Sequence, residues 1–176
     1  MAAANFDRCL GAVLRHEGGY VDDPRDNGGA TNKGVTLATL KEAKVDLDGD
    51  GDTDKADLKR LTDKDAGKIY KARYWNTVHG DELPSGLDYM LFDASVNHGP
   101  ARARRWLQQA LGVSVDGVLG PKTFAALRAA SAAALLAKIA GYREALYRNH
   151  EDFDRFGRGW MRRLTDVSRV ASQMLA

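Results

Sequence analysis

The strongest constraint on the fold is an apolar helical stripe that stops at a carboxyl group followed by two glycines. Glu17 lies eleven residues after Phe6, and eleven steps of about 100° nearly complete three turns, so both fall on one helix face. Gly18-Gly19 then supplies left-handed or extended backbone that stops a helix. We expect a first helix over about residues 3–17, with Glu17 facing whatever that helix packs against. The stripe consists of Phe6, Leu10 and Val13.

A carboxyl group in that position suits acid catalysis. Burial against a neighbouring element and the negative end of the helix dipole both disfavour a carboxylate, so we expect Glu17 to keep its proton. A glycosidase needs such a group to protonate the leaving oxygen. An isolated glutamate at a helix end is more often simply solvated, so spacing alone leaves both interpretations open.

The longer string HEGGYVDDPRDNGGATNKGVT resembles the signature of the glycoside hydrolase family 108 muramidases, over residues 15–36. These are lysozyme-like endolysins of phages and of some bacterial secretion systems. The resemblance implies a mainly α, lysozyme-like fold with a small irregular or β flap after the first helix. It also implies hydrolysis (EC 3.2.1.17) of the β-1,4 bond between N-acetylmuramic acid and N-acetylglucosamine, with Glu17 as general acid. Related phage lysozymes carry an Asp and a Thr further on, which implies that Asp26 stabilises the oxocarbenium ion or, with Thr31, positions the attacking water.

Substrate contacts are expected from aromatic and polar side chains near this region. Tyr20 belongs to the same string, and Tyr74 lies in a cluster of aromatic residues, although aromatic residues at helical spacing are more often core. A buried helix that starts at Leu87 ends at Asn97 and His98, in the string DYMLFDASVNHGP, which also resembles the family. For His98 the alternative is a polar niche in the core, which sequence alone favours.

Residues 46–57 form an acidic loop with six aspartates in twelve residues. Oxygen ligands at loop positions 1, 3, 5, 9 and 12, with Gly51 at position 6, match the register of an EF-hand calcium loop. The aspartate at position 12 resembles dockerin-type loops. We expect a structural calcium ion here and no cofactor for catalysis, the alternative being a solvated acidic turn. The expected ligands are Asp46, Asp48, Asp50, Asp52, Asp54 and Asp57.

The C-terminal part is expected to bind peptidoglycan. VDGVLGPKT at residues 115–123 resembles the turn of small peptidoglycan-binding modules, in which a second helix starts at the proline. Two further helices are expected over residues 131–150 and from Gly159 onward. The last carries an apolar stripe among arginines; we favour packing onto the body over membrane disturbance. We therefore divide the chain into a lysozyme-like region, 1–98, with the inserted loop 46–57, and a helical peptidoglycan-binding region, 99–176.

Composition narrows the environment and the partners. The single cysteine, Cys9, forbids an internal disulfide. No apolar run approaches the roughly 20 residues of a membrane span, and the N-terminus does not have the pattern of a signal peptide. We expect a monomer without nucleic-acid binding or stable membrane insertion, made in the cytoplasm and acting in the periplasm or on the cell wall. A holin pore or a dedicated exporter would then give access to peptidoglycan.

Two other functions remain open from sequence. A lytic transglycosylase also uses one glutamate but leaves anhydromuramyl ends instead of reducing ends. The chain could also be a non-catalytic peptidoglycan-binding module, given the VDGVLGPKT turn and the acidic loop.

Overall fold

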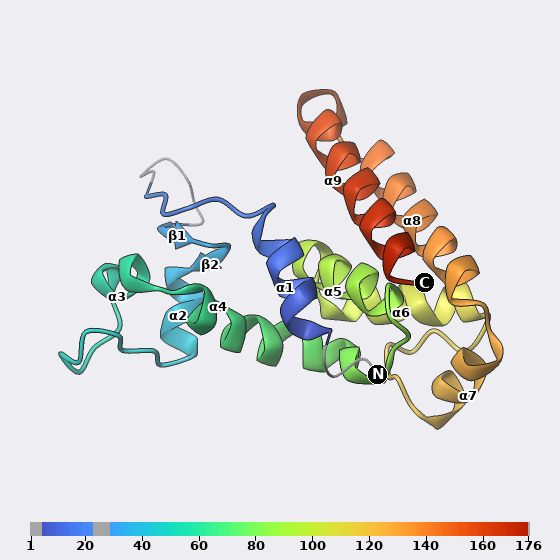
Figure 1. The fold of residues 1–176 in the computed structure, drawn as a ribbon. Helices are drawn as coiled ribbons and strands as arrows, with labels where there is room; N and C mark the ends of the chain where they lie inside the picture. The colour runs from blue at the N-terminus through green and yellow to red at the C-terminus, as the bar shows by residue number, and fades with distance from the viewer. Residues whose placement is uncertain (1–4, 23–28, 176) are drawn as a thin grey trace. The chain divides into compact units, whose positions relative to one another are not determined.

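A computed structural model describes residues 5–22 and 29–175 (Figure 1). The chain forms two compact units. The first comprises Leu10–Ala72, and the second comprises Arg73 onward together with the described residues up to Cys9. Helix α1, Phe6–Leu14, contributes its first four residues to the second unit and the rest to the first.

The first unit is built around a small β-hairpin. Strand β1, Thr31–Asn32, pairs antiparallel with β2, Val35–Thr36. The two residues between them, Lys33 and Gly34, have φ values of 50° and 72°. Positive φ at both positions is the requirement of a type I′ turn, whose twist matches that of the paired strands. The hairpin is followed by three short helices, α2 (Leu37–Glu42), α3 (Lys55–Arg60) and α4 (Asp63–Tyr70).

Side-chain caps set where these short helices begin. Thr36 accepts a hydrogen bond from the Thr39 backbone N–H, and Thr62 does the same for Asp65. Such caps satisfy N–H groups that have no partner inside the helix. The sequence predicted both helix starts, and both are confirmed. After α4 the chain continues in a π-helical segment, Lys71–Trp75.

The second unit is a helical assembly around α5, Leu87–His98. Every residue of α5 from Leu87 to Ser95 is buried, as the continuous apolar run predicted. The unit's further elements are the 3₁₀ turns Asn76–Val78 and Gly80–Glu82, α6 (Pro100–Leu111), α7 (Pro121–Ala129), α8 (Ala132–Arg148) and α9 (Phe153–Met174). Helix α5 contacts α6, α8 and α9, and α8 and α9 lie side by side (Figure 1).

Two helix boundaries differ from the prediction. Helix α1 ends at Leu14, so Glu17 lies in the turn that follows it, and neither Gly18 nor Gly19 has a positive φ. Helix α9 begins at Phe153, six residues before the predicted start at Gly159. Gly157 lies inside this helix, and the Phe153 ring packs over its Cα. A side chain would not fit there, because an added Cβ would lie only 2.5 Å from the ring.

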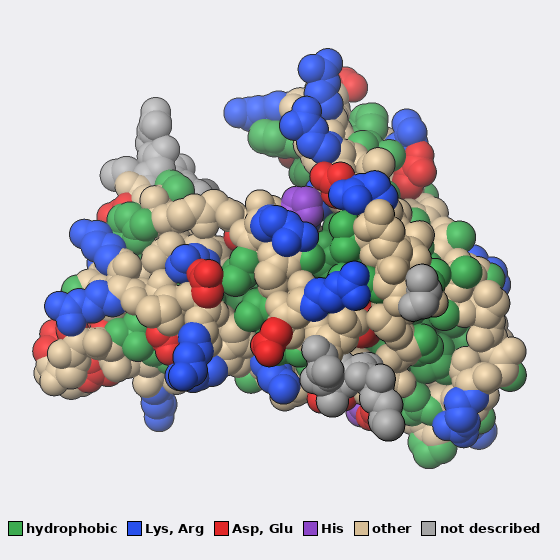
Figure 2. Space-filling model, viewed as in Figure 1, with side chains coloured by type: hydrophobic (Ala, Val, Ile, Leu, Met, Phe, Trp, Pro, Cys, Tyr) green, Lys and Arg blue, Asp and Glu red, His purple; other side chains and the backbone are tan. Residues whose placement is uncertain are grey.

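The fold class predicted from sequence is confirmed. The structure is mainly α and lysozyme-like, and the described residues contain one two-stranded sheet, which forms the small flap after α1. The apolar stripe of α9 is buried through Leu164, Val167, Ala171 and Met174. Its exposed side carries Arg155, Arg158 and Arg162, and basic side chains gather over this helix in Figure 2. Among the described residues no single helix has the length and apolarity to cross a membrane; only α7 and α8 together do, with a 114° bend between them.

Candidate active site

Glu17 faces the turn of the β-hairpin. Its side chain is half-buried, and its backbone N–H donates to the Leu14 carbonyl at 3.2 Å, which prolongs the last turn of α1. A Cβ added at Gly34 would lie 2.7 Å from Glu17 Oε2 and even closer to the Tyr70 hydroxyl. The carboxyl group and the phenol therefore converge on the same point above the Gly34 Cα.

The surroundings of the carboxyl group are held by backbone and side-chain hydrogen bonds. The Lys33 N–H donates to the Gly18 carbonyl at 3.1 Å, and the Tyr70 hydroxyl donates to the Lys33 carbonyl at 3.1 Å. The buried Asn32 side chain donates to the Leu58 carbonyl at 2.8 Å. The turn is thereby fixed both to the segment that carries Glu17 and to the helices behind it.

The other predicted residues of this unit lie on the flap. Thr31 pairs through its backbone with Val21, with both hydrogen bonds at 2.8 Å, and its hydroxyl donates to the Gly29 carbonyl at 3.3 Å. Tyr20 is half-buried, its hydroxyl donates to Asp22 at 3.3 Å, and the Lys59 ammonium lies 5.3 Å from its ring centre. Asp26 lies outside the described residues. Glu17, Tyr20 and Thr31 all lie in the first unit, each beside different neighbours: Glu17 with the hairpin turn, Tyr20 with Asp22 and Lys59, and Thr31 with Val21 and Gly29.

The acidic loop connects α2 to α3 and forms two groups of carboxylates. Asp46, Asp48 and Asp50 form one group, and Asp52, Asp54 and Asp57 form the other; in each group the oxygens lie within 4.8 Å of one another. Mutual repulsion is evident in this loop. Burial and the neighbouring Asp50 raise the pKa of Asp48, and Asp50 with burial raises the pKa of Asp52. Only oxygen ligands are offered, which suits a hard cation such as calcium.

Asp57 makes structural hydrogen bonds that the sequence did not indicate. Its buried carboxylate accepts backbone N–H groups from Asp54 at 2.8 Å and from Leu47 at 2.6 Å, which lowers its pKa. Asp54 caps α3 and forms a capping box with Asp57. The last acid of the loop therefore also closes the loop onto the helix.

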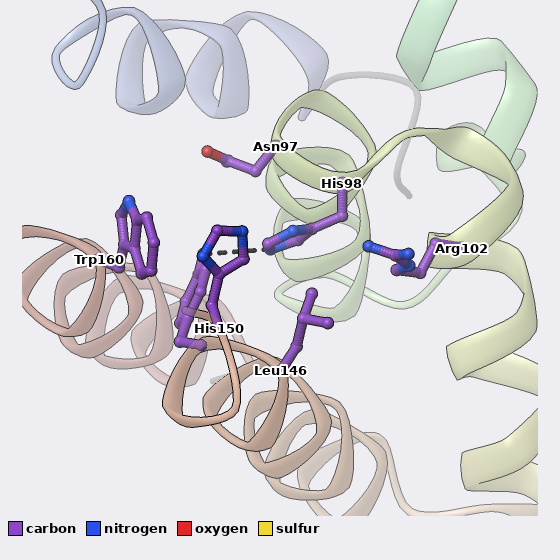
Figure 3. Close-up of a pocket in the computed structure, with 7 residues that line it drawn as sticks. Asn97, His98, Arg102, Leu146, His150 and Trp160 are labelled. Carbon is purple, nitrogen blue, oxygen red and sulfur yellow. Dashed lines mark hydrogen bonds between the residues drawn. The ribbon is translucent and has the colours of Figure 1, made fainter. Parts of the chain in front are cut away.

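The other predicted substrate contacts belong to the second unit. Tyr74 is half-buried in the π-helical segment. Asn97 and His98, at the end of α5, line a pocket of about 310 Å³ (Figure 3). Helices α6, α8 and α9 and the turn after α8 complete it. The residues that they contribute are Arg102, Leu146, Tyr147, His150 and Trp160.

His98 fills a polar niche and lines the pocket at the same time. Its Nε2 lies 3.1 Å from the Tyr147 hydroxyl, and the Tyr147 oxygen is 3.5 Å from the Arg143 guanidinium. Burial and Arg143 lower the pKa of His98 to about 4. His98 is therefore neutral at physiological pH.

A buried ion-pair cluster contacts the pocket residue Tyr147 through Arg143. Asp93 is fully buried and accepts from Arg143 at 2.6 Å and from Arg163 at 2.9 Å. Burial disfavours the Asp93 carboxylate, but the two guanidinium groups outweigh it and hold its pKa below the usual range. Sequence reasoning missed these residues because they lie 50 and 70 positions apart.

The VDGVLGPKT segment folds as its resemblance predicted. Helix α6 ends, Gly117 adopts a φ of 81°, and α7 starts at Pro121. The buried Gln108 organises the turn: its amide donates to Asp116 at 2.7 Å and accepts from the Gly117 N–H at 2.7 Å. Gln108 lies outside the motif, which is why the sequence did not single it out.

Two protein-family models match this chain. Residues 10–99 match the model of the family described as Glycosyl hydrolase 108. The chain belongs to glycosyl hydrolase family 108. Within this family assignment, residues 102–165 match a second model, described as "Predicted Peptidoglycan domain". The family 108 chain is accordingly a peptidoglycan-degrading hydrolase, and peptidoglycan is its partner.

A solved structure is similar over nearly the whole chain. It is described as the structure of SagA from Brucella abortus, with 40% sequence identity and a TM-score of 0.84. The match covers 99% of this chain and 97% of that one. A search of curated proteins gave no match.

Proposed function

We propose that this family 108 hydrolase is an endolysin-type N-acetylmuramidase, a lysozyme in which Glu17 is the general acid. The observation that carries the proposal is the position of the Glu17 carboxyl group against Gly34 and Tyr70. A carboxyl group held at a fixed place beside a phenol and a tight turn is suited to donate a proton to a glycosidic oxygen in a defined direction.

In this proposal the remaining catalytic roles fall to Asp26 and Thr31. Asp26 stabilises the oxocarbenium ion or, together with Thr31, positions the attacking water. Thr31 is well suited to a positioning role because its backbone pairs with Val21 on one side and with Thr36 on the other. Tyr20, Tyr74, Asn97 and His98 are the proposed substrate contacts.

Replacement of Glu17 by Gln tests the proposal. The change preserves shape and removes the proton, so we expect lysis of purified peptidoglycan sacculi to fall by about 10²-fold or more. Glu151→Gln is the matched control because Glu151 is exposed. Mass spectrometry of the wild-type products should show reducing ends. Anhydromuramyl ends would identify a transglycosylase instead, and a folded Glu17→Gln protein with full lytic activity would refute the role of Glu17.

We also propose that the acidic loop binds calcium as a structural ion. Both carboxylate groups offer converging oxygens, and Asp48 Oδ1 is buried without a hydrogen-bond partner, as expected of an atom placed to meet a cation. The ion would offset the repulsion among the six acids and fix α2 to α3. Calorimetric titration with calcium chloride should show binding that Asp48→Asn weakens. Absence of any binding heat and of any calcium-dependent rise in Tm would reject the site.

The site of action follows from the substrate in this proposal. Because peptidoglycan lies outside the cytoplasmic membrane, we propose that the enzyme acts in the periplasm or on the wall, as a monomer, after passage through a holin pore or an exporter. Sedimentation of the purified protein and fractionation of producing cells test these two points.

A further inference from the structure

The pocket in Figure 3 presents several hydrogen-bond donors. The Arg143 guanidinium can only donate, so the Tyr147 hydroxyl accepts from it, and the same hydroxyl lies 3.1 Å from His98 Nε2. This contact occupies His98 Nε2 and leaves Nδ1 as the ring nitrogen that can meet a ligand. At His150 the arrangement is the reverse: Nδ1 accepts the Asp152 backbone N–H at 3.2 Å, which leaves Nε2–H as the donor.

Arg102 adds a positive charge to these donors. It is exposed and makes neither a hydrogen bond nor an ion pair with the residues that the structure describes. In Figure 3 its guanidinium lies on the side of His98 opposite to Trp160. The Asp152 carboxylate lies 3.9 Å from His150 Nδ1, on the ring edge away from the free donor.

An apolar face completes the pocket. Trp160 stacks on Tyr147 with ring centres 5.5 Å apart and an angle of 27°, and His150 meets the indole edge-on at 5.1 Å. Leu146 lies beside them. Rigid aromatic rings of this kind bind the apolar face of a sugar or a small aliphatic group. Asn97 donates its amide to the Asp93 carbonyl at 2.7 Å, so its side-chain oxygen remains available as an acceptor.

A ligand that matches this pocket has a carboxylate, a neighbouring apolar surface and an amide N–H. Peptidoglycan carries these three features together at the start of the stem peptide. There the lactyl carboxyl of muramic acid is an amide to L-alanine, and the α-carboxyl of the second residue, γ-linked D-glutamate, is free; the N-acetylglucosamine units lack a carboxylate. We propose that the pocket binds the acidic stem peptide next to muramic acid, with this α-carboxylate held by Arg102 and the His150 Nε2–H, and apolar groups on Trp160. This inference rests on the proposed muramidase function. In it, the pocket is the part of the enzyme that recognises glycan strands bearing a stem peptide.

A pair of matched probes tests the charge requirement. Binding of N-acetylmuramyl-L-alanyl-D-glutamate γ-methylamide, which has a free α-carboxylate, is compared with that of the corresponding α-carboxamide, by calorimetry on the full-length Glu17→Gln protein. We expect the acidic probe to bind about tenfold tighter, since a hydrogen-bonded ion pair with Arg102 contributes to it alone. Because both probes are measured on one protein, the comparison does not depend on the folding of a pocket variant.

Variants then assign the preference to the pocket. Arg102→Gln should abolish the difference between the two probes, whereas Arg105→Gln, an exposed arginine of the same helix that does not line the pocket, should keep it. Equal affinity of the two probes, no binding of either probe, or equal effects of the two variants would overturn the proposal. Lysis of sacculi by the wild-type protein is measured separately, so failure of the pocket proposal is distinguishable from failure of the muramidase proposal.

Discussion

Gly34→Ala probes the contact on which the proposed catalysis depends. Gly34 has a φ of 72°, so an L side chain there costs about 1–2 kcal/mol in backbone strain. The added Cβ would also lie 2.7 Å from Glu17 Oε2, well inside the 3.4 Å at which ordinary contact begins. The carboxyl group must therefore retreat by more than half an ångström, and the Tyr70 hydroxyl must move as well.

The expected result is a loss of activity larger than the loss of stability can explain. Displacement of a catalytic group by about 1 Å can lower the rate by roughly 10²-fold. We expect the maximal rate of sacculus lysis to fall by about 10-fold to 100-fold, whereas a domain of ordinary stability stays folded after a loss of about 1–2 kcal/mol. Turbidity loss at saturating substrate gives the rate, and urea unfolding gives the free energy of unfolding.

Gly112→Ala is the matched control. Gly112 also has a φ of 72°, but a Cβ there meets no atom within 4 Å. It should show the same backbone penalty and the lytic rate of the wild type. A folded Gly34→Ala protein with the lytic rate of the Gly112→Ala control would refute the reasoning, because the contact with Glu17 would then have no catalytic consequence.

Two further predictions concern the buried charges of the second unit. Asp93→Asn should lower the free energy of unfolding by about 3–5 kcal/mol, because Arg143 and Arg163 would lose their carboxylate in the core; an unchanged denaturation midpoint would contradict this. His98 has its pKa lowered to about 4, and an unfolded histidine titrates near 6.5, so the unfolded chain binds the extra proton between these values. The free energy of unfolding should rise by about 2 kcal/mol from pH 4 to pH 6.5, and His98→Gln should flatten this part of the pH profile; an equal slope in both proteins would exclude His98 as its source.

Much of the local structure was decided by sequence. Thr36 and Thr62 cap helices where the pattern predicted, since a cap depends only on the few residues that follow it. The turn at Gly117 and the helix start at Pro121 follow for the same reason. The predicted extension of α1 to Glu17 was wrong, because helical spacing identifies the face of a helix but not its last turn.

The arrangement of side chains in both candidate sites could be seen only in the tertiary structure. Sequence marked Glu17 as an acid, but its approach to Gly34 and Tyr70 depends on the hairpin register and on α4, which lies more than forty residues further along the chain. The pocket at His98 depends in the same way on side chains from α6, α8 and α9 that no motif connects. Caps and turns are fixed by neighbours in sequence, whereas a charge such as Asp93 finds its partners only when packing removes water and brings distant helices into contact.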